Sequence, residues 1–128
     1  MTIWILAVLV LFFVQTMLAP IAQWLLSDGF RVREALGPRD TSPPLSKVSA
    51  RLDRAFKNMK EAMVLFLPLA LLAEMKGLSG GLAANGAVLF LVARTLYIPA
   101  YISGIPGLRS AVWMIGHAGI GLIAAALL

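Results

Sequence analysis

The sequence contains no cysteine and little charge. Without cysteine there is no disulfide, no thiol nucleophile and no thiolate metal site, so any sulfur chemistry has to come from a ligand. Charged residues make up only 13% of the 128 positions, whereas hydrophobic residues make up 60%. This composition is too apolar for a soluble domain of this length. We therefore expect a membrane protein, and no metal site is predicted.

Four apolar stretches are long enough to cross roughly 30 Å of hydrocarbon as helices. They cover residues 3–26, 52–75, 79–101 and 109–128, with a connecting segment at 27–51. The expected fold is an all-α membrane protein, a single four-transmembrane-helix bundle over residues 1–128. The first stretch lacks a basic leader and is longer than the core of a cleavable signal, so we expect it to be retained.

The eleven basic residues are unevenly distributed. Eight fall between residues 31 and 60, Arg94 and Arg109 lie near the connection between the third and fourth stretches, and Lys76 alone lies on the other side. This pattern predicts that segment 27–54 is cytoplasmic and that both termini are outside, periplasmic if the membrane is a bacterial inner membrane. Topology and contact with anionic lipid explain the pI near 10.3 better than nucleic acid does, so no nucleic-acid partner is expected.

Polar residues form a line along the start of the second predicted helix. At about 100° per residue, Arg51, Arg54, Asn58 and Glu61 share one helical face. Ser49 is the expected N-cap of this helix. A carboxylate a turn or more inside a membrane span costs several kcal/mol unless it meets a cation, a hydrogen-bond donor or water. We therefore expect Glu61 to face other protein.

The next two predicted helices bring cations and aromatic side chains to the same membrane depth. They are Arg94, Tyr97 and Tyr101 on one face of the third helix, and Arg109, Ser110 and Trp113 at the start of the fourth. One interpretation is structural, a buried ion pair of Glu61 with Arg94 plus an interfacial aromatic belt. The favoured interpretation is a polar pocket for an anionic ligand, because four arginines outnumber the one buried acid.

Three motifs occur in a specific order. R-x-x-R-A-x-x-N-x-x-E in "RLDRAFKNMKEA" is followed one span later by R-x-x-Y-x-x-x-Y in "ARTLYIPAY", and then by "GIPGLRS". Their order and spacing resemble the MAPEG superfamily, the membrane-associated proteins of eicosanoid and glutathione metabolism. The resemblance covers essentially the whole chain and is greatest to bacterial, microsomal glutathione transferase-like members. It implies a homotrimer that binds glutathione as a co-substrate between neighbouring protomers, near the cytoplasmic side.

The resemblance also implies roles for individual residues. Arg54, Asn58 and Glu61 would hold the glutathione backbone, with Glu61 suited to the ammonium group and Arg54 to a carboxylate. Arg109 would lie beside the thiol as the catalytic residue. The remaining candidates for the glutathione site are Arg51, Arg94, Tyr97 and Tyr101, and, with a looser correspondence, Arg31, Arg33, Ser110 and Trp113.

The chemistry agrees with these roles. The glutathione thiol has an ordinary pKa of about 8.5, so a thiolate at neutral pH requires nearby positive charge. A guanidinium such as that of Arg109 stays protonated where a lysine would not. Lowering the thiol pKa by about two units corresponds to roughly 2.7 kcal/mol. The implied function is a glutathione transferase or peroxidase that acts on hydrophobic electrophiles or lipid hydroperoxides from the bilayer.

Some positions depart from the family pattern or have no assigned role. Trp113 stands where some members have a tyrosine. His117 is predicted to be a helix-packing residue, because it lies deeper than the other polar groups and has no evident partner. Gly116, Gly119 and Gly121 are expected to permit close helix contact.

Two other classes of function remain open. A small multidrug or ion-coupled transporter would use Glu61 as its membrane-embedded carboxylate, although Arg94 and Arg109 would repel a cationic substrate. A non-catalytic, lipid-binding scaffold with the same fold is the second alternative, and the retained site residues argue against it.

Overall fold

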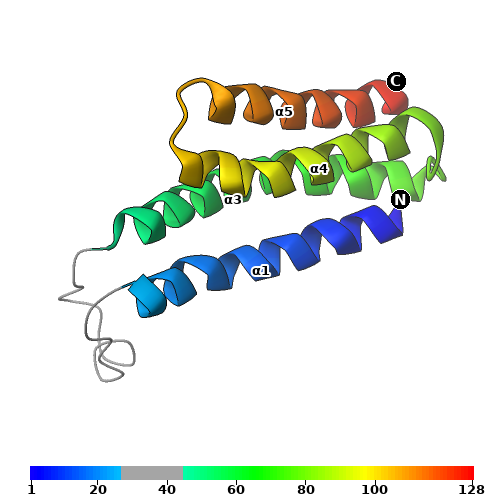
Figure 1. Cartoon of the computed structure of the whole chain (residues 1–128). Coiled ribbons are helices and arrows are strands. Elements are labelled where there is room, and N and C mark those ends of the chain that lie inside the picture. The colour runs from blue at the N-terminus through cyan, green and yellow to red at the C-terminus, as the bar shows by residue number, and fades with distance from the viewer. Residues whose placement is uncertain (27–44) are drawn as a thin grey trace.

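The computed structural model describes residues 1–26 and 45–128, and over those residues it contains four helices and no strand. In chain order the helices are α1 (Thr2–Leu26), α3 (Lys47–Met75), α4 (Gly81–Ser103) and α5 (Leu108–Leu127). They lie side by side with both termini at the same end of the bundle (Figure 1). The predicted all-α four-helix bundle is confirmed. The candidate residues Arg31 and Arg33 lie outside the described part of the chain.

The start of α3 differs from the sequence prediction. The helix begins at Lys47 rather than at residue 52, so residues 47–51 are helical and do not belong to the connecting segment. The predicted N-cap was wrong: Ser46 is the cap, and its Oγ accepts a hydrogen bond from the Ser49 backbone N at 3.1 Å. The Gln23 side chain of α1 supports this cap, because its Oε1 accepts from the Ser46 backbone N at 2.9 Å.

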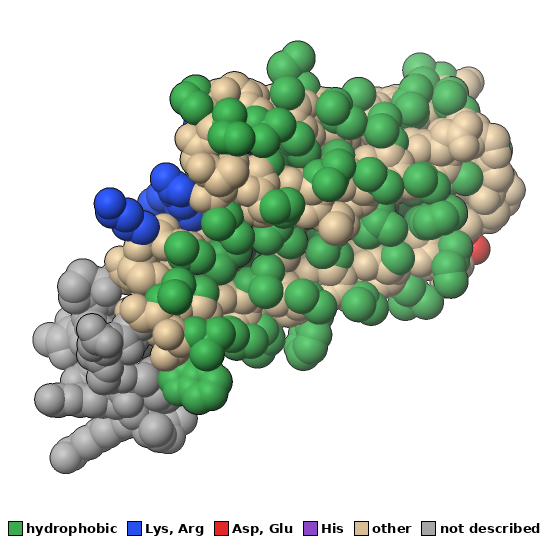
Figure 2. Space-filling view, viewed as in Figure 1, with side chains coloured by type: hydrophobic (Ala, Val, Ile, Leu, Met, Phe, Trp, Pro, Cys, Tyr) green, Lys and Arg blue, Asp and Glu red, His purple; other side chains and the backbone are tan. Residues whose placement is uncertain are grey.

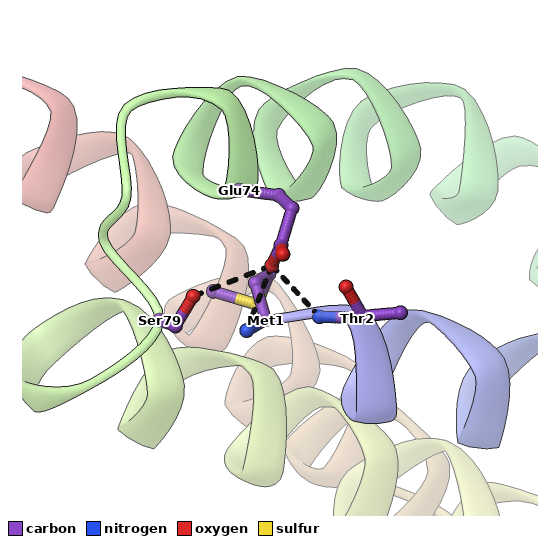
Figure 3. A network of polar contacts seen from close by, with 4 residues as sticks. All are labelled: Met1, Thr2, Glu74 and Ser79. Atoms are coloured by element: carbon purple, nitrogen blue, oxygen red, sulfur yellow. Dashed lines mark hydrogen bonds and ion pairs between the residues drawn. The ribbon is translucent and has the colours of Figure 1, made fainter.

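Hydrogen bonds fix α1 to α3 at both ends of their contact. At one end the hydroxyl of Ser49, which is fully buried, donates to the Ala19 carbonyl at 2.9 Å. At the other end one carboxylate oxygen of Glu74 accepts from the Thr2 backbone N at 2.8 Å and pairs with the Met1 ammonium at 2.9 Å (Figure 3). The Ser79 hydroxyl donates to the same oxygen at 3.4 Å. The two helices are therefore held in one antiparallel register.

The middle of the bundle is a close-packed core shared by all four helices. The rings of Phe66 in α3 and Phe90 in α4 stack with centroids 4.3 Å apart and an interplanar angle of 8°. Val8 of α1 and Ile123 of α5 are also completely buried in this cluster. Because lipid is as apolar as these side chains, the helices are held together by shape and dispersion contacts more than by exclusion of water.

The contact between α4 and α5 depends on two glycines. A Cβ on Gly86 would lie 2.5 Å from the Gly119 carbonyl oxygen, and a Cβ on Gly119 would lie 2.6 Å from the Gly86 carbonyl oxygen. The two backbones therefore touch directly, as small residues permit in membrane bundles. The expected close contact at Gly121 was wrong, because a Cβ there would meet nothing within 4 Å.

The turn between α4 and α5 is anchored by an arginine from α3. Gly104 ends α4 in the left-handed conformation, with φ of 69°, which a residue without a side chain adopts at least cost. The Arg51 guanidinium donates to the Ile102 carbonyl in the last turn of α4. A Cβ on Gly104 would lie 2.6 Å from Arg51 Nη2, so a larger residue here would also displace the Arg51 guanidinium.

Three of the four helices, α1, α4 and α5, are long and apolar enough to span a membrane by length and composition. The predicted span at 52–75 is not among them, because residues 58–75 of α3 include the charged residues Lys60, Glu61 and Glu74. Hydrophobic side chains cover the flank of the bundle, and basic side chains gather where α3 begins (Figure 2). We call this end, which contains Arg51, Arg54 and Arg109, the arginine-rich end.

Candidate functional site

The polar line of α3 is divided between structural contacts and exposed groups. Arg51 is half-buried, and its guanidinium donates to the Ile102 carbonyl, as described above. Arg54 and Glu61 are exposed, and Asn58 between them is half-buried. The Asn58 Nδ2 lies 3.5 Å from a Glu61 carboxylate oxygen. The exposed part of this face thus offers one cation, one amide and one carboxylate to a ligand or a neighbouring chain.

Arg94 is buried, with only 1% of its surface exposed. Its Nη1 donates to Asn58 Oδ1 at 2.7 Å, and its Nε has no hydrogen-bond partner. The guanidinium lies 5.2 Å from the Phe90 ring centroid and 5.4 Å from that of Tyr97, distances typical of cation–π contacts. The alternative ion pair with Glu61 does not form in the described chain, where the partner of Arg94 is the neutral Asn58.

His117 has a partner, contrary to the sequence expectation. Its Nδ1 lies 2.9 Å from the Trp113 carbonyl oxygen and 3.5 Å from Arg94 Nη2. A carbonyl only accepts, so the shorter contact places a proton on Nδ1, and Arg94 then meets it in van der Waals contact rather than as a donor. The His117 ring also packs on the Trp113 ring, with centroids 3.8 Å apart. His117 therefore packs against both Trp113 and Arg94.

Tyr101 is the point where two arginines from different helices meet. The guanidinium carbon of Arg54 in α3 lies 6.0 Å from its ring centroid, and that of Arg109 in α5 lies 5.2 Å away. Tyr97 packs edge-on against the same ring, with centroids 5.4 Å apart. Among residues 1–26 and 45–128, no carboxylate forms an ion pair with either arginine. The two guanidinium groups therefore make the surroundings of Tyr101 electropositive.

An open cavity adjoins these residues on the α4–α5 side. It has a volume of about 350 Å³. Its lining consists of Tyr97, Arg109, Ser110, Trp113 and Met114. A second, smaller hollow of about 100 Å³ lies at the turn before α5 and shares Arg109 with the first. Arg109 is thus the residue common to both openings.

The structure separates the sequence-predicted candidates into groups. Those that lie together at the arginine-rich end are Arg54, Asn58, Tyr97, Tyr101, Arg109, Ser110 and Trp113. Arg94 is buried and hydrogen-bonded to Asn58 of this group, and Arg51 donates a hydrogen bond to the Ile102 carbonyl near the α4–α5 turn. Met114 lines the cavity but was not predicted, because an apolar residue in an apolar helix gives no signal of its own.

Comparison with known proteins identifies the family of the chain. A family model described as the MAPEG family matches residues 1–128, the whole chain. The chain belongs to the MAPEG family. Neither a curated protein nor a solved structure gives a significant match. The MAPEG family includes glutathione transferases and related proteins, and together with the apolar helices this membership makes the chain an integral membrane protein.

Proposed function

We propose that this MAPEG protein binds glutathione at the arginine-rich end and directs its thiolate at a lipid-soluble electrophile or hydroperoxide. The observation that carries the proposal is the pair of arginines around Tyr101. Arg54 and Arg109 come from different helices and have no carboxylate partner among the described residues, and Arg109 lines a cavity open to the surroundings. Guanidinium groups that no described carboxylate neutralises favour a ligand with carboxylates and a thiolate.

A carboxylate, the ammonium group and the sulfur of glutathione each have a suitable partner at this end of the bundle. The Arg54 guanidinium suits a carboxylate, and the Glu61 carboxylate suits the ammonium group. Arg109 suits the sulfur, because a fixed positive charge favours the thiolate over the thiol. In a transferase reaction the sulfur forms a bond to an electrophilic carbon while a leaving group departs or a double bond takes up the electron pair.

The apolar lining supports an electrophile that arrives from the membrane. Trp113 and Met114 form part of the cavity wall and are exposed in α5. An apolar substrate dissolved in lipid would meet this wall directly, with Arg109 at the same opening. We further propose a homotrimer in a bacterial inner membrane, with the arginine-rich end cytoplasmic, in keeping with the distribution of basic residues.

Glutathione titration of the detergent-purified protein, followed by thiolate absorbance near 240 nm, tests the proposal. We expect the wild type to bind glutathione and to show thiolate at pH 7. Arg109→Ala is expected to show about twentyfold less thiolate, the change in ionised fraction for a thiol pKa about two units higher. The matched control is Lys76→Ala, which removes a cation from the opposite end of the bundle, where its Nζ donates to the Leu127 carbonyl.

Two results would contradict the proposal in different ways. No binding at millimolar glutathione would favour the non-catalytic scaffold. Proton-coupled uptake of a cationic dye by proteoliposomes, abolished by Glu61→Gln, would favour the transporter.

A further inference from the structure

We propose that Arg94 is a positioning residue for the glutathione site: its buried guanidinium fixes the Asn58 carboxamide so that the amide N–H₂ faces Glu61 and the ligand. This inference rests on the proposed function for the identity of the ligand. It differs from the sequence expectation, in which Arg94 itself lines the pocket.

The direction of the Asn58 amide follows from hydrogen-bond chemistry. The oxygen and nitrogen of a carboxamide are nearly equivalent in shape, so the partner decides which way the group points. A guanidinium has donors and no acceptor. The atom 2.7 Å from Arg94 Nη1 is therefore the Asn58 oxygen, and the nitrogen turns outward, to 3.5 Å from a Glu61 carboxylate oxygen. The reverse orientation would bring two donors together beside a buried charge.

The burial of Arg94 explains why it acts through Asn58. Only 1% of its surface is exposed, and neither cavity is lined by it. The rings of Phe90 and Tyr97 lie against the guanidinium, and a Cβ on Gly116 would lie 3.5 Å from its Nε. Since these neighbours leave the group little freedom, the orientation of Asn58 is set before a ligand arrives.

The oriented amide makes the exposed face selective. Asn58 presents a donor and Glu61, one helical turn further on, presents an acceptor. This pair matches an amino acid end group, whose carboxylate accepts from the amide N–H₂ while its ammonium donates to the Glu61 carboxylate. Glutathione has such a group at one end. Under the proposed function, the Asn58–Glu61 pair that Arg94 orients would meet this amino acid end of glutathione.

Two variants separate positioning from simple support of the fold. Arg94→Met removes the guanidinium and keeps a long side chain, whereas Asn58→Asp keeps an acceptor for Arg94 but replaces the outward N–H₂ by a second acceptor. We expect Asn58→Asp to remain folded, because its new ion pair with Arg94 offsets the repulsion between its second oxygen and Glu61, and yet to bind glutathione at least about tenfold more weakly, the effect of one lost hydrogen bond. Lys57→Met is the control, since Lys57 is an exposed cation next to Asn58 in sequence that pairs with Asp53.

A ligand-free measurement tests the same contact. The chain has two asparagines, so protein labelled with ¹⁵N-asparagine gives two side-chain amide signals, and the exposed Asn85 is an internal reference. We expect the Asn58 amide to be rigid in the wild type and in Lys57→Met, and to become as mobile as that of Asn85 in Arg94→Met. Glutathione binding by Arg94→Met is expected to fall roughly tenfold, and adding Asn58→Ala to it should lower affinity no further.

Each outcome tests either the positioning role of Arg94 or the proposed function. Wild-type affinity in Asn58→Asp, or a rigid Asn58 amide in Arg94→Met, would overturn the positioning role. Full additivity of Arg94→Met and Asn58→Ala would do the same, because the two residues would then act independently. If the wild type does not bind glutathione but Arg94→Met still frees the Asn58 amide, the proposed function fails while the positioning role stands.

Discussion

Replacing Gly119 by alanine tests the direct backbone contact between α4 and α5. The added Cβ would lie 2.6 Å from the Gly86 carbonyl oxygen and 2.8 Å from the Phe90 backbone N. Carbon and oxygen atoms of neighbouring helices normally stay about 3.3 Å apart or more, so the helices would have to separate by about 0.7 Å. Overpacking of this kind costs about 1–3 kcal/mol, offset by about 0.5–1 kcal/mol because alanine is the better helix former. We expect a net loss of about 1–2 kcal/mol.

The assay is the free energy of unfolding, measured by reversible denaturant titration in mixed micelles. Gly121→Ala is the matched control, because the same chemical change in the same helix meets open space, and it is expected to be neutral or slightly stabilising. The double variant Gly86→Ala, Gly119→Ala should cost less than the sum of its parts, since one separation of the helices relieves both contacts. Equal stability of Gly119→Ala and Gly121→Ala would refute the close-contact argument.

Two further predictions concern the interior. Ser49→Ala removes the hydrogen bond to the Ala19 carbonyl and is expected to lower the free energy of unfolding by about 1 kcal/mol, whereas Thr95→Val, which loses only a bond within its own helix, should change it by less than about half as much. Phe66→Ala removes one ring of the buried stack and should cost about 2–3 kcal/mol by the same titration, less than in a water-soluble core because lipid also solvates the ring. Leu65→Ala, at an exposed position in the same turn, should cost little, and a loss equal to that of Phe66→Ala would contradict the assignment of the core.

The helix content could be predicted from the sequence because hydrocarbon enforces it. A long apolar stretch in a membrane has to satisfy its backbone internally, so helices follow from composition alone. The start of α3 could not be predicted in the same way. Its cap at Ser46 is completed by Gln23 of another helix, and such a tertiary contact leaves no local pattern around Ser46 itself.

The hydrogen-bond partner of Arg94 could not be predicted from the sequence either. Asn58 and Glu61 lie three residues apart on one helical face, so periodicity places both opposite Arg94 and cannot choose between them. The structure chooses Asn58, at 2.7 Å. His117 was predicted to have no partner because a side chain that bonds to a carbonyl of its own helix, here that of Trp113, leaves no pattern in the sequence. Its approach to Arg94 depends on how closely α4 and α5 pack, and the glycines that permit this packing do not reveal which side chains it brings together.

Glu61 is the middle residue of α3, and its side chain is exposed on the surface of the chain. At the depth that the predicted span at 52–75 gives it, this acid would lie against acyl chains in a solitary subunit, at a cost of several kcal/mol. We therefore expect Glu61 to be shielded from lipid in the assembled protein by an adjacent subunit, a hydrated crevice or a bound solute. Purification that strips this shield is expected to yield material that reinserts poorly into liposomes, and the choice of detergent then bears directly on whether activity can be measured at all.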